Sequence, residues 1–344
     1  MEKVVQLHRK IAPELITIVE DRYNILRHIQ YAEPLGRRAL AGMLGMGERV
    51  VRAQVDFLKN AGFIDYSALG MTVTTAGQAV LFDLAEYIRL LHGLTMLETE
   101  LAARLRLKQV VIIPGDSDAD IMVQRELGRA ASGVLGHYLG DNMTIAVSGG
   151  STMAQVAAAI HMSQHTTTVV PARGGLGEQV EYQANTIAAG IANKLGGCYR
   201  LLHIPDGVSE AVVEAILSSD TNIHSVADMI KQADILVHGI GQARNMAIRR
   251  GLDETVITSL ISQGATGEAL GHYCTRQGEV VYVTSSVGLH LADLQEIGVV
   301  IAVAGGQEKA EAIVAVMNAG GQDILITDEA AARKIQWIIN DSCV

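Results

Sequence analysis

The sequence predicts an α/β protein with an N-terminal winged helix-turn-helix domain and a C-terminal domain built on a doubly wound, largely parallel sheet. Two observations carry this prediction. Residues 37–59 read as a short helix, a Gly-containing turn and a second helix, the unit that lays a helix in the DNA major groove. After residue 107, short apolar runs alternate with helical stretches, which is typical of parallel strands covered on both faces. We expect domains at residues 1–80 and 107–344, joined by connecting helices at 81–106.

Composition supports this division. The chain has 344 residues, of which 49% are apolar, enough to fill more than one core. Residues 1–60 carry ten Lys or Arg and seven Asp or Glu, a net charge of +3, whereas the remainder carries 17 against 30, a net charge of -13. A basic N-terminal segment on an otherwise acidic chain is typical of a single DNA-binding module attached to a domain that does not bind DNA.

Neither a membrane span nor a secretion signal is recognisable. No apolar run approaches the roughly 20 residues that span a bilayer, and the N-terminus lacks the apolar segment of a signal peptide. Cys198, Cys274 and Cys343 are scattered and odd in number, so we expect buried free thiols. A cytoplasmic protein is the expectation.

The N-terminal domain, residues 1–80, is called the head below, and it begins with a helical pattern from Ile11 to Ala32. Helices are then expected at residues 37–44 and 48–59, with Gly45-Met46-Gly47 as the turn between them. Strands at 62–66 and 71–74 would form the wing. Val51, Val55 and Leu58 keep helical spacing on the second helix, and we assign them to the core.

Five polar residues of the head are candidates for DNA contact. Arg49, Arg52 and Gln54 lie on the second helix beside its apolar stripe; Arg can read guanine and Gln can read adenine. Arg37 and Arg38 open the preceding helix and are expected to contact phosphates. For Arg49 and Arg52 the alternative is an ordinary solvated helix face without a role in DNA binding. One recognition helix contacts few base pairs, so we expect a homo-oligomer, a dimer or a tetramer, on double-stranded operator DNA.

The connecting helices begin with capping signals. Thr75-Ala76-Gly77-Gln78 fits a capping box before apolar residues at 81, 84, 88 and 91, and Thr95-Met96-Leu97-Glu98 repeats the device. Leu84, Ile88 and Leu91 are candidates for pairing between subunits. Packing against the chain's own domains is the alternative.

Glycine-rich loops follow several predicted strands of the C-terminal domain. Strands are expected at residues 110–113, 143–147, 168–170, 201–204, 235–237, 280–283, 299–303 and 324–326. Ligands of such sheets bind beyond the carboxyl ends of the strands. The loops there are Ser148-Gly149-Gly150-Ser151-Thr152, Pro171-Ala172-Arg173-Gly174-Gly175-Leu176-Gly177, His238-Gly239-Ile240-Gly241 and Ala304-Gly305-Gly306-Gln307-Glu308-Lys309.

These loops together predict a small phosphorylated ligand. Backbone N–H groups at a helix N-terminus bind anions, and Arg173 could hold a phosphate through two hydrogen bonds. Arg249, Arg250 and Lys309 are further cations in the pattern. A Gly-rich turn is also a common structural requirement, and none of the four has the spacing of a nucleotide-binding motif.

An enzyme is the alternative function. A sugar-phosphate isomerase or deaminase needs a general base, and Asp116, Asp118, Glu268, His238 and His272 are the candidates. No nucleophile elbow or zinc motif occurs, so we expect neither a metal nor a cofactor.

Several segments resemble one known family over nearly the whole chain. They are Glu33-Pro34-Leu35-Gly36-Arg37-Arg38, Gly47-Glu48-Arg49-Val50, Pro114-Gly115-Asp116-Ser117-Asp118, the Pro171 to Glu178 segment, Gln183-Ala184-Asn185-Thr186, Leu236-Val237-His238-Gly239-Ile240-Gly241 and Ala302-Val303-Ala304-Gly305-Gly306. The chain resembles the SorC family of sugar-binding transcriptional regulators. The resemblance implies a repressor of glycolytic genes whose operator binding is weakened by fructose 1,6-bisphosphate or a related phosphosugar, on an isomerase-like fold.

The resemblance also implies roles for individual residues. Gly150, Ser151 and Thr152 would hold one phosphate with Lys309, although Ser151 replaces an expected Thr. The sugar and phosphates would lie among Arg173, Leu176, Gly177 and Gln183, with Glu268 accepting sugar hydroxyls. Of the arginine pair, Arg250 would reach the phosphate. The enzyme relatives carry Asp-Gly-His where this chain has Gln242-Ala243-Arg244, which favours a sensor over an enzyme.

Overall fold

A computed structural model describes residues 10–161, 166–177 and 179–341. The chain divides into two compact units, Met1–Thr95 and Met96–Val344, which are described separately. The expected connecting segment at residues 81–106 is split between them. Cys343 lies outside the described residues, Cys274 is a buried free thiol, and Cys198 is exposed, where burial was expected.

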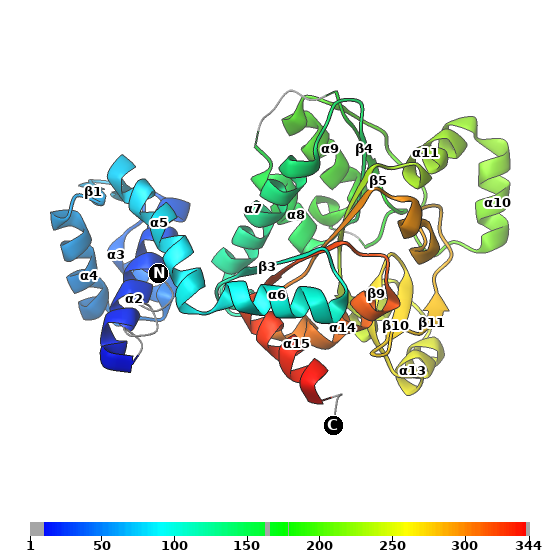
Figure 1. The fold of residues 1–344 in the computed structure, drawn as a ribbon. Helices are drawn as coiled ribbons and strands as arrows, with labels where there is room; N and C mark the ends of the chain where they lie inside the picture. Colours follow the sequence, from blue (N-terminus) through cyan, green and yellow to red (C-terminus); the bar gives the residue numbers. More distant parts are fainter. Residues whose placement is uncertain (1–9, 162–165, 178, 342–344) are drawn as a thin grey trace. The chain divides into compact units, whose positions relative to one another are not determined.

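The first unit is a helical domain with a two-stranded wing (Figure 1). Its elements are α2 (Pro13–Ala32), α3 (Arg37–Leu44), α4 (Glu48–Asn60), β1 (Ile64–Ser67), β2 (Gly70–Val73) and α5 (Thr75–Leu91). Gly45 ends α3 with φ of 62°, a left-handed conformation that Gly adopts at little cost. Val51, Val55 and Leu58 are buried in the head core, as predicted. The predicted helix-turn-helix and wing are therefore confirmed.

The apolar stripe of α5 belongs to the core of the head. Leu81, Ile88 and Leu91 are buried in the same cluster as the core of α4, so packing within the chain, the alternative to pairing between subunits, describes them. The helix is capped by Thr74 and not by the expected Thr75, because the Thr74 hydroxyl accepts the hydrogen bond from the Gly77 N–H. Gly77 has no side chain to complete a capping box.

The second unit contains a seven-stranded parallel sheet in the order β3-β13-β12-β7-β4-β5-β6. Every described pairing in it is parallel. The strands are β3 (Gln109–Ile113), β4 (Thr144–Val147), β5 (Thr168–Pro171), β6 (Cys198–Tyr199), β7 (Ile235–Gly239), β12 (Val299–Val303) and β13 (Ile324–Asp328). The strand predicted at residues 201–204 is wrong, since the pairing with β5 comes earlier, at Cys198–Tyr199.

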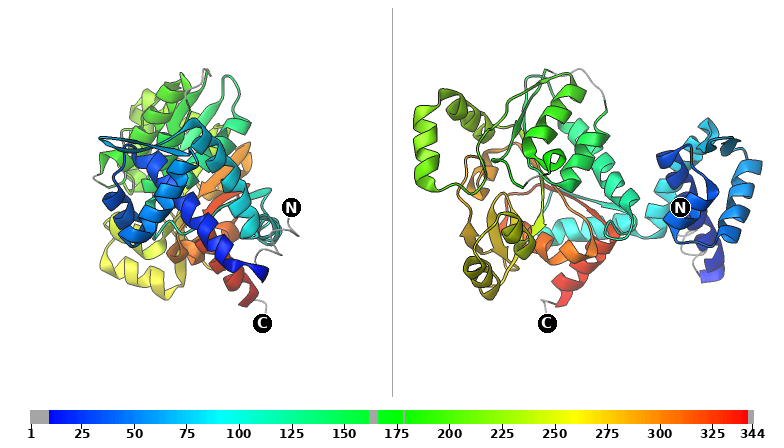
Figure 2. Two further views of the ribbon diagram at one scale, coloured as in Figure 1. Left: turned by 90° about the vertical axis from the view of Figure 1, so that its left-hand side faces the viewer. Right: turned by 180° about the vertical axis from the view of Figure 1, so that it is seen from behind.

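Helices cover both faces of this sheet (Figures 1 and 2). One face packs against α7 (Ile121–Tyr138), α8 (Ser151–Ala159) and α9 (Ala184–Leu195). The other packs against α11 (Thr221–Lys231) and the 3-10 helix η2 (Leu291–Glu296). Burial on both faces explains why the strand runs are apolar throughout instead of alternating.

A second, four-stranded antiparallel sheet is an addition that the sequence did not predict. Its order is β11-β10-β9-β8, with β8 (Gly241–Gln242), β9 (Ala265–Ala269), β10 (His272–Thr275) and β11 (Val280–Val283). The strand expected at 280–283 therefore exists, but in this sheet. With α12 (Ala243–Arg249) and α13 (Glu254–Ser262) it encloses a small core around Tyr273.

The remaining helices complete the second unit. They are α6 (Leu94–Leu105), η1 (Val180–Tyr182), α10 (Glu210–Ser219), η3 (Gln307–Lys309), α14 (Ala310–Ala319) and α15 (Glu329–Asp341). Glu98 on α6 accepts a hydrogen bond from the Ile112 N–H at 2.7 Å, so it fastens α6 to the sheet. The capping box expected at Thr95–Glu98 stays a prediction. Within the described residues, no helix is long and apolar enough to span a membrane.

Candidate functional site

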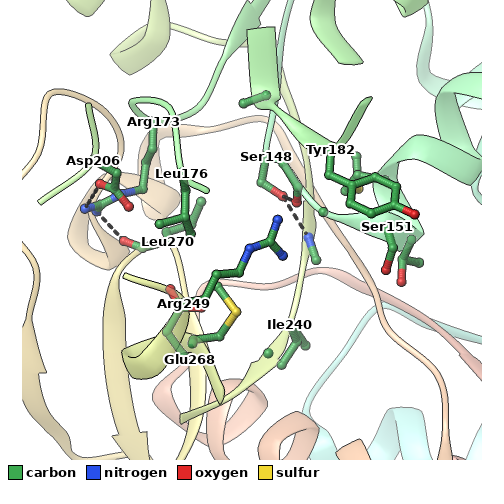
Figure 3. Close-up of a pocket in the computed structure, with 18 of the residues that line it drawn as sticks. Ser148, Ser151, Arg173, Leu176, Tyr182, Asp206, Ile240, Arg249, Glu268 and Leu270 are labelled. Atoms are coloured by element: carbon green, nitrogen blue, oxygen red, sulfur yellow. Dashed lines mark hydrogen bonds and ion pairs between the residues drawn. The ribbon is translucent and has the colours of Figure 1, made fainter. Parts of the chain in front are cut away.

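The second unit contains a cavity of about 290 Å³. Its lining comes from the carboxyl ends of β4, β5 and β7 and from the antiparallel sheet, as expected for ligand sites of open parallel sheets. Nine of the expected ligand residues line it: Gly149, Gly150, Ser151, Thr152, Arg173, Leu176, Arg250, Glu268 and Lys309. Figure 3 shows several of them around one central space.

The N-terminus of α8 opens into this cavity without a side-chain cap. Gly150 is its N-cap residue, with φ of 123°, and no side chain bonds to the first N–H groups. Those N–H groups and the hydroxyls of Ser151 and Thr152 are donors for an anion, which the helix dipole also favours. Gly149 is required by packing, because a Cβ there would lie 2.7 Å from the Tyr182 carbonyl oxygen.

Lys309 supplies a positive charge to the same cavity. Burial lowers the pKa of its ammonium group, while Asp118 and Asp328 oppose that shift. The Oδ2 atom of Asp328 is already engaged, because it accepts hydrogen bonds from Ser117 and from the Gly306 N–H at 2.6 Å. Within the described part of the chain, the ammonium group of Lys309 has no hydrogen-bond partner. It is therefore a cation ready to pair with a bound anion.

Arg173 lines the cavity but is fully engaged by the protein. Its Nε and Nη2 donate to Asp206 Oδ1 at 3.2 and 2.9 Å. The other bonds go to three backbone carbonyl oxygens, those of Leu270, Thr284 and Leu289. These contacts use all five guanidinium donors. The side chain therefore joins the two sheets, and its expected contact with a phosphate stays a prediction.

Arg250 is engaged in the same way, and its expected phosphate contact stays a prediction. Its guanidinium pairs with Asp206 Oδ2 at 3.0 Å and Glu268 Oε1 at 2.9 Å, and donates to the Tyr273 hydroxyl. Glu268 Oε1 also accepts from the Gly271 N–H at 2.6 Å. Glu268 Oε2 has no partner among the described residues and remains an acceptor for a ligand hydroxyl.

Arg249 is the member of the arginine pair that reaches the cavity. It is exposed, and Figure 3 shows its guanidinium in the space between Leu176, Ser148 and Ile240. The reason is helical geometry, since successive residues at the end of α12 point in directions about 100° apart. Arg250 therefore turns inward and Arg249 outward, a difference that the sequence pattern did not reveal.

Gly177 and Gln183 do not line the cavity, although they were expected around the ligand. Gln183 instead holds the preceding loop, because its Oε1 accepts from the Leu176 N–H at 3.1 Å and its Nε2 donates to the Gly177 carbonyl. Sequence reasoning also missed Tyr182 and Asp206, both of which line the cavity. Asp206 lies in Pro205-Asp206-Gly207, which reads as an ordinary turn signal.

Four of the five candidates for acid–base catalysis lie outside the cavity lining. His238 is fully buried, and burial lowers its pKa to about 4. His272 packs edge-on against His290, and burial lowers its pKa to about 4 as well. Asp116 and Asp118 belong to the loop beside Asp328. Of the five candidates, only Glu268 lines the cavity. The described residues contain no group of three or more His, Cys, Asp or Glu placed to hold a metal.

The head presents a candidate DNA-reading helix. Arg49 and Arg52 are exposed on α4, on the side away from its buried residues, and Arg37 and Arg38 are exposed on α3. Arg38 Nε pairs with Glu48 at 3.2 Å. Gln54 is placed differently from its expected role, because its Oε1 accepts from Arg22 Nε at 2.9 Å. Helix α2 therefore occupies the side of α4 that Gln54 faces.

Comparison with known proteins agrees with both sites. The family model of the CggR N-terminal DNA binding domain matches residues 18–88, and the model described as "Putative sugar-binding domain" matches residues 90–336. The central glycolytic genes regulator of Priestia megaterium is 43% identical, over 97% of this chain and 98% of its own length. That of Bacillus subtilis is 40% identical, over 97% and 99%.

Solved structures give the same result. A SorC family transcriptional regulator from Enterococcus faecalis is 39% identical with a TM-score of 0.65, over 70% of this chain and 99% of that one. The full-length sorbitol operon regulator SorC from Klebsiella pneumoniae shares the fold at 16% identity and a TM-score of 0.65, over 92% and 98%. The relatives of high identity are named as regulators, and this chain matches the model of a DNA-binding domain; both findings favour a regulator over the enzyme alternative. The chain therefore belongs to the SorC family of sugar-binding transcriptional regulators, in the group of the central glycolytic genes regulators.

Proposed function

We propose that this protein represses glycolytic genes as a homo-oligomer, and that fructose 1,6-bisphosphate weakens its binding to operator DNA. One observation carries the proposal: a single chain holds an arginine-bearing recognition helix and a cavity whose uncommitted groups suit phosphate. The glycolytic target and the sign of the response follow from the likeness to the central glycolytic genes regulators.

The distribution of charge supports a ligand with two phosphates. The α8 N-terminus and Lys309 offer one set of donors, and Arg249 offers a separate positive charge in the same cavity. Glu268 Oε2 lies in the same lining and is an acceptor suited to a sugar hydroxyl. A sugar bisphosphate supplies an anion for each of the two positive charges, whereas a free sugar would leave both cations unpaired.

The decisive experiment is a titration of DNA from upstream of a glycolytic operon, with and without fructose 1,6-bisphosphate, at fixed salt and pH. Coupling energies of about 1–3 kcal/mol correspond to a drop of about 5- to 150-fold in operator affinity. Divalent ions are omitted, so that chelation by the bisphosphate cannot mimic the effect. Unchanged or tighter DNA binding at saturating ligand contradicts the proposal.

Two variants connect the response to the two sites. Arg52→Ala should weaken operator binding with or without the sugar. Lys309→Met should bind the operator normally and lose the response to the sugar. Light scattering on the free protein and on its operator complex tests the oligomer, because a monomer in both states contradicts that part of the proposal.

A further inference from the structure

One arginine of α2 contacts two side chains of α4 beside the apolar core of the head. Arg22 Nε donates to Gln54 Oε1 at 2.9 Å, and the Arg22 guanidinium carbon lies 3.5 Å from the centroid of the Phe57 ring. Gln54 and Phe57 are three residues apart, so they are neighbours on one side of α4. Arg22 and Gln54 are half-buried, and Phe57 is 45% exposed. A single planar group therefore bridges adjacent turns of the candidate reading helix.

These contacts constrain α4 in a way that its apolar core does not. Val51, Val55 and Leu58 are buried in the core of the head, but the burial of apolar surface has no preferred direction. A hydrogen bond from a rigid guanidinium and its stacking on a ring are directional. A rotation of α4 by about 10° would move a side-chain tip by about 1 Å, which exceeds the roughly 0.5 Å within which a binding geometry must be held.

We propose that Arg22 is a positioning residue for operator recognition, which holds α4 at the rotation that aims its exposed arginines at base edges. It acts through Gln54 and Phe57 and does not itself touch the DNA. This inference rests on the proposed role of α4 as the reading helix and deepens it. Loss of Arg22 should therefore weaken binding to a specific DNA site, whereas binding to unrelated DNA, which depends on phosphate contacts, should not change.

The test compares two DNA duplexes of equal length and composition. One is selected from random sequence for tight binding to the wild-type chain, and the other is its shuffled sequence. Titrations of the full chain give the ratio of the two dissociation constants. Arg22→Met should lower the preference for the selected DNA about tenfold, because one hydrogen bond and one cation–π contact together correspond to about that factor. Arg22→Lys keeps the charge without the planar fork and should lose most of the same preference.

A mutant cycle separates positioning from a direct DNA contact. Arg22 Nη1 and Nη2 have no hydrogen-bond partner among the described residues, so the alternative is that they bind a phosphate. Adding Arg22→Met to a Gln54→Ala/Phe57→Ala protein should change nothing further, because the positioning contacts are already gone. A phosphate contact would instead weaken the binding of both duplexes in either background and would reduce the salt dependence by about one unit of slope.

Lys10→Met is the matched control for charge. Lys10 is exposed and has no hydrogen bond or ion pair among the described residues of the chain. Its replacement removes the same charge from the head and should leave the ratio unchanged. Circular dichroism checks that every variant is folded at the temperature of the titrations.

A wild-type ratio in folded Arg22→Met overturns the proposal, and so does an equal loss of affinity for both duplexes. Arg22→Lys and Gln54→Ala/Phe57→Ala decide in the same way if Arg22→Met does not fold. A wild-type ratio in an Arg49→Ala/Arg52→Ala protein would remove α4 as the reading helix, and this proposal with it. A lost ratio there, with a wild-type ratio in Arg22→Met, overturns the positioning role alone. The titrations contain no sugar, so failure of the proposed effector would not affect this test.

Discussion

Replacing Lys309 by Met should separate ligand binding from stability. Lys309 is half-buried in the cavity wall, and its pKa is lowered because burial outweighs the attraction of the ammonium group to Asp118 and Asp328. Met has a similar length and no charge to bury. Asp328 keeps its hydrogen bonds to Ser117 and Gly306. The ligand-free variant should therefore be as stable as the wild type or slightly more stable.

The loss should appear only with ligand. Hydrogen bonds to charged groups contribute about 1.5–3 kcal/mol, so the dissociation constant for fructose 1,6-bisphosphate should rise about 10- to 150-fold. Ligand at 100 times the wild-type dissociation constant stabilises the wild type by about 2.7 kcal/mol, and a variant with about 50-fold weaker binding by only about 0.6 kcal/mol.

Thermal denaturation measures this difference. The expected ligand-induced rise in Tm is about 5–10 °C for the wild type and about 1–3 °C for Lys309→Met, at about 2–4 °C per kcal/mol for a domain of this size. Lys334→Met is the matched control, because Lys334 lies over the Trp337 ring, outside the cavity. A wild-type shift in Lys309→Met would refute the reasoning, as would an equal loss of Tm with and without ligand.

The remaining predictions concern the DNA-binding domain, the loop that contains Gly149, and the dependence on pH. Arg52→Ala should weaken operator binding by about 1–3 kcal/mol in a mobility-shift titration if this side chain reads a base. Unchanged operator affinity in an Arg49→Ala/Arg52→Ala protein would exclude α4 as the helix that reads the DNA sequence. Gly149→Ala, whose Cβ meets a backbone oxygen at 2.7 Å, should lower stability by about 1–3 kcal/mol and weaken sugar-phosphate binding, whereas Gly133→Ala on open α7 surface should do neither. The pKa of His238 is about 4 in the folded protein, against an ordinary 6.5. Its contribution to the free energy of unfolding is therefore present above pH 6.5 and lost as pH falls toward 4. Urea unfolding should show that this free energy falls by up to about 3 kcal/mol over that range, and by less in His238→Gln. A bound phosphate raises the lowered pKa of Lys309, so the affinity for the sugar phosphate should fall as pH rises through that lowered pKa. Calorimetric titrations over a pH series measure this fall. A fall in affinity that is equally steep in Lys309→Met would contradict the role of Lys309.

The sequence by itself determined the two domain types and the general position of the ligand site. Periodicity and turn chemistry are local properties, so the helix-turn-helix, the wing and the apolar parallel strands could be read from neighbouring residues. The position of the ligand site at one edge of the sheet could be predicted as well, because parallel strands place their carboxyl ends together. Hence Gly149, Gly150, Ser151, Thr152 and Lys309 were found from the loops that contain them.

Only the tertiary structure decided which charges are available. The sequence does not reveal that Arg173 and Arg250 both pair with Asp206, which is distant from them along the chain. Gln54 looked like a base-reading residue, but Arg22 on α2 holds it. An isolated arginine and a paired one have the same local sequence signal. Their partners depend on the packing of separate elements, so the difference between a ligand-binding group and a structural one arises only when the chain is folded.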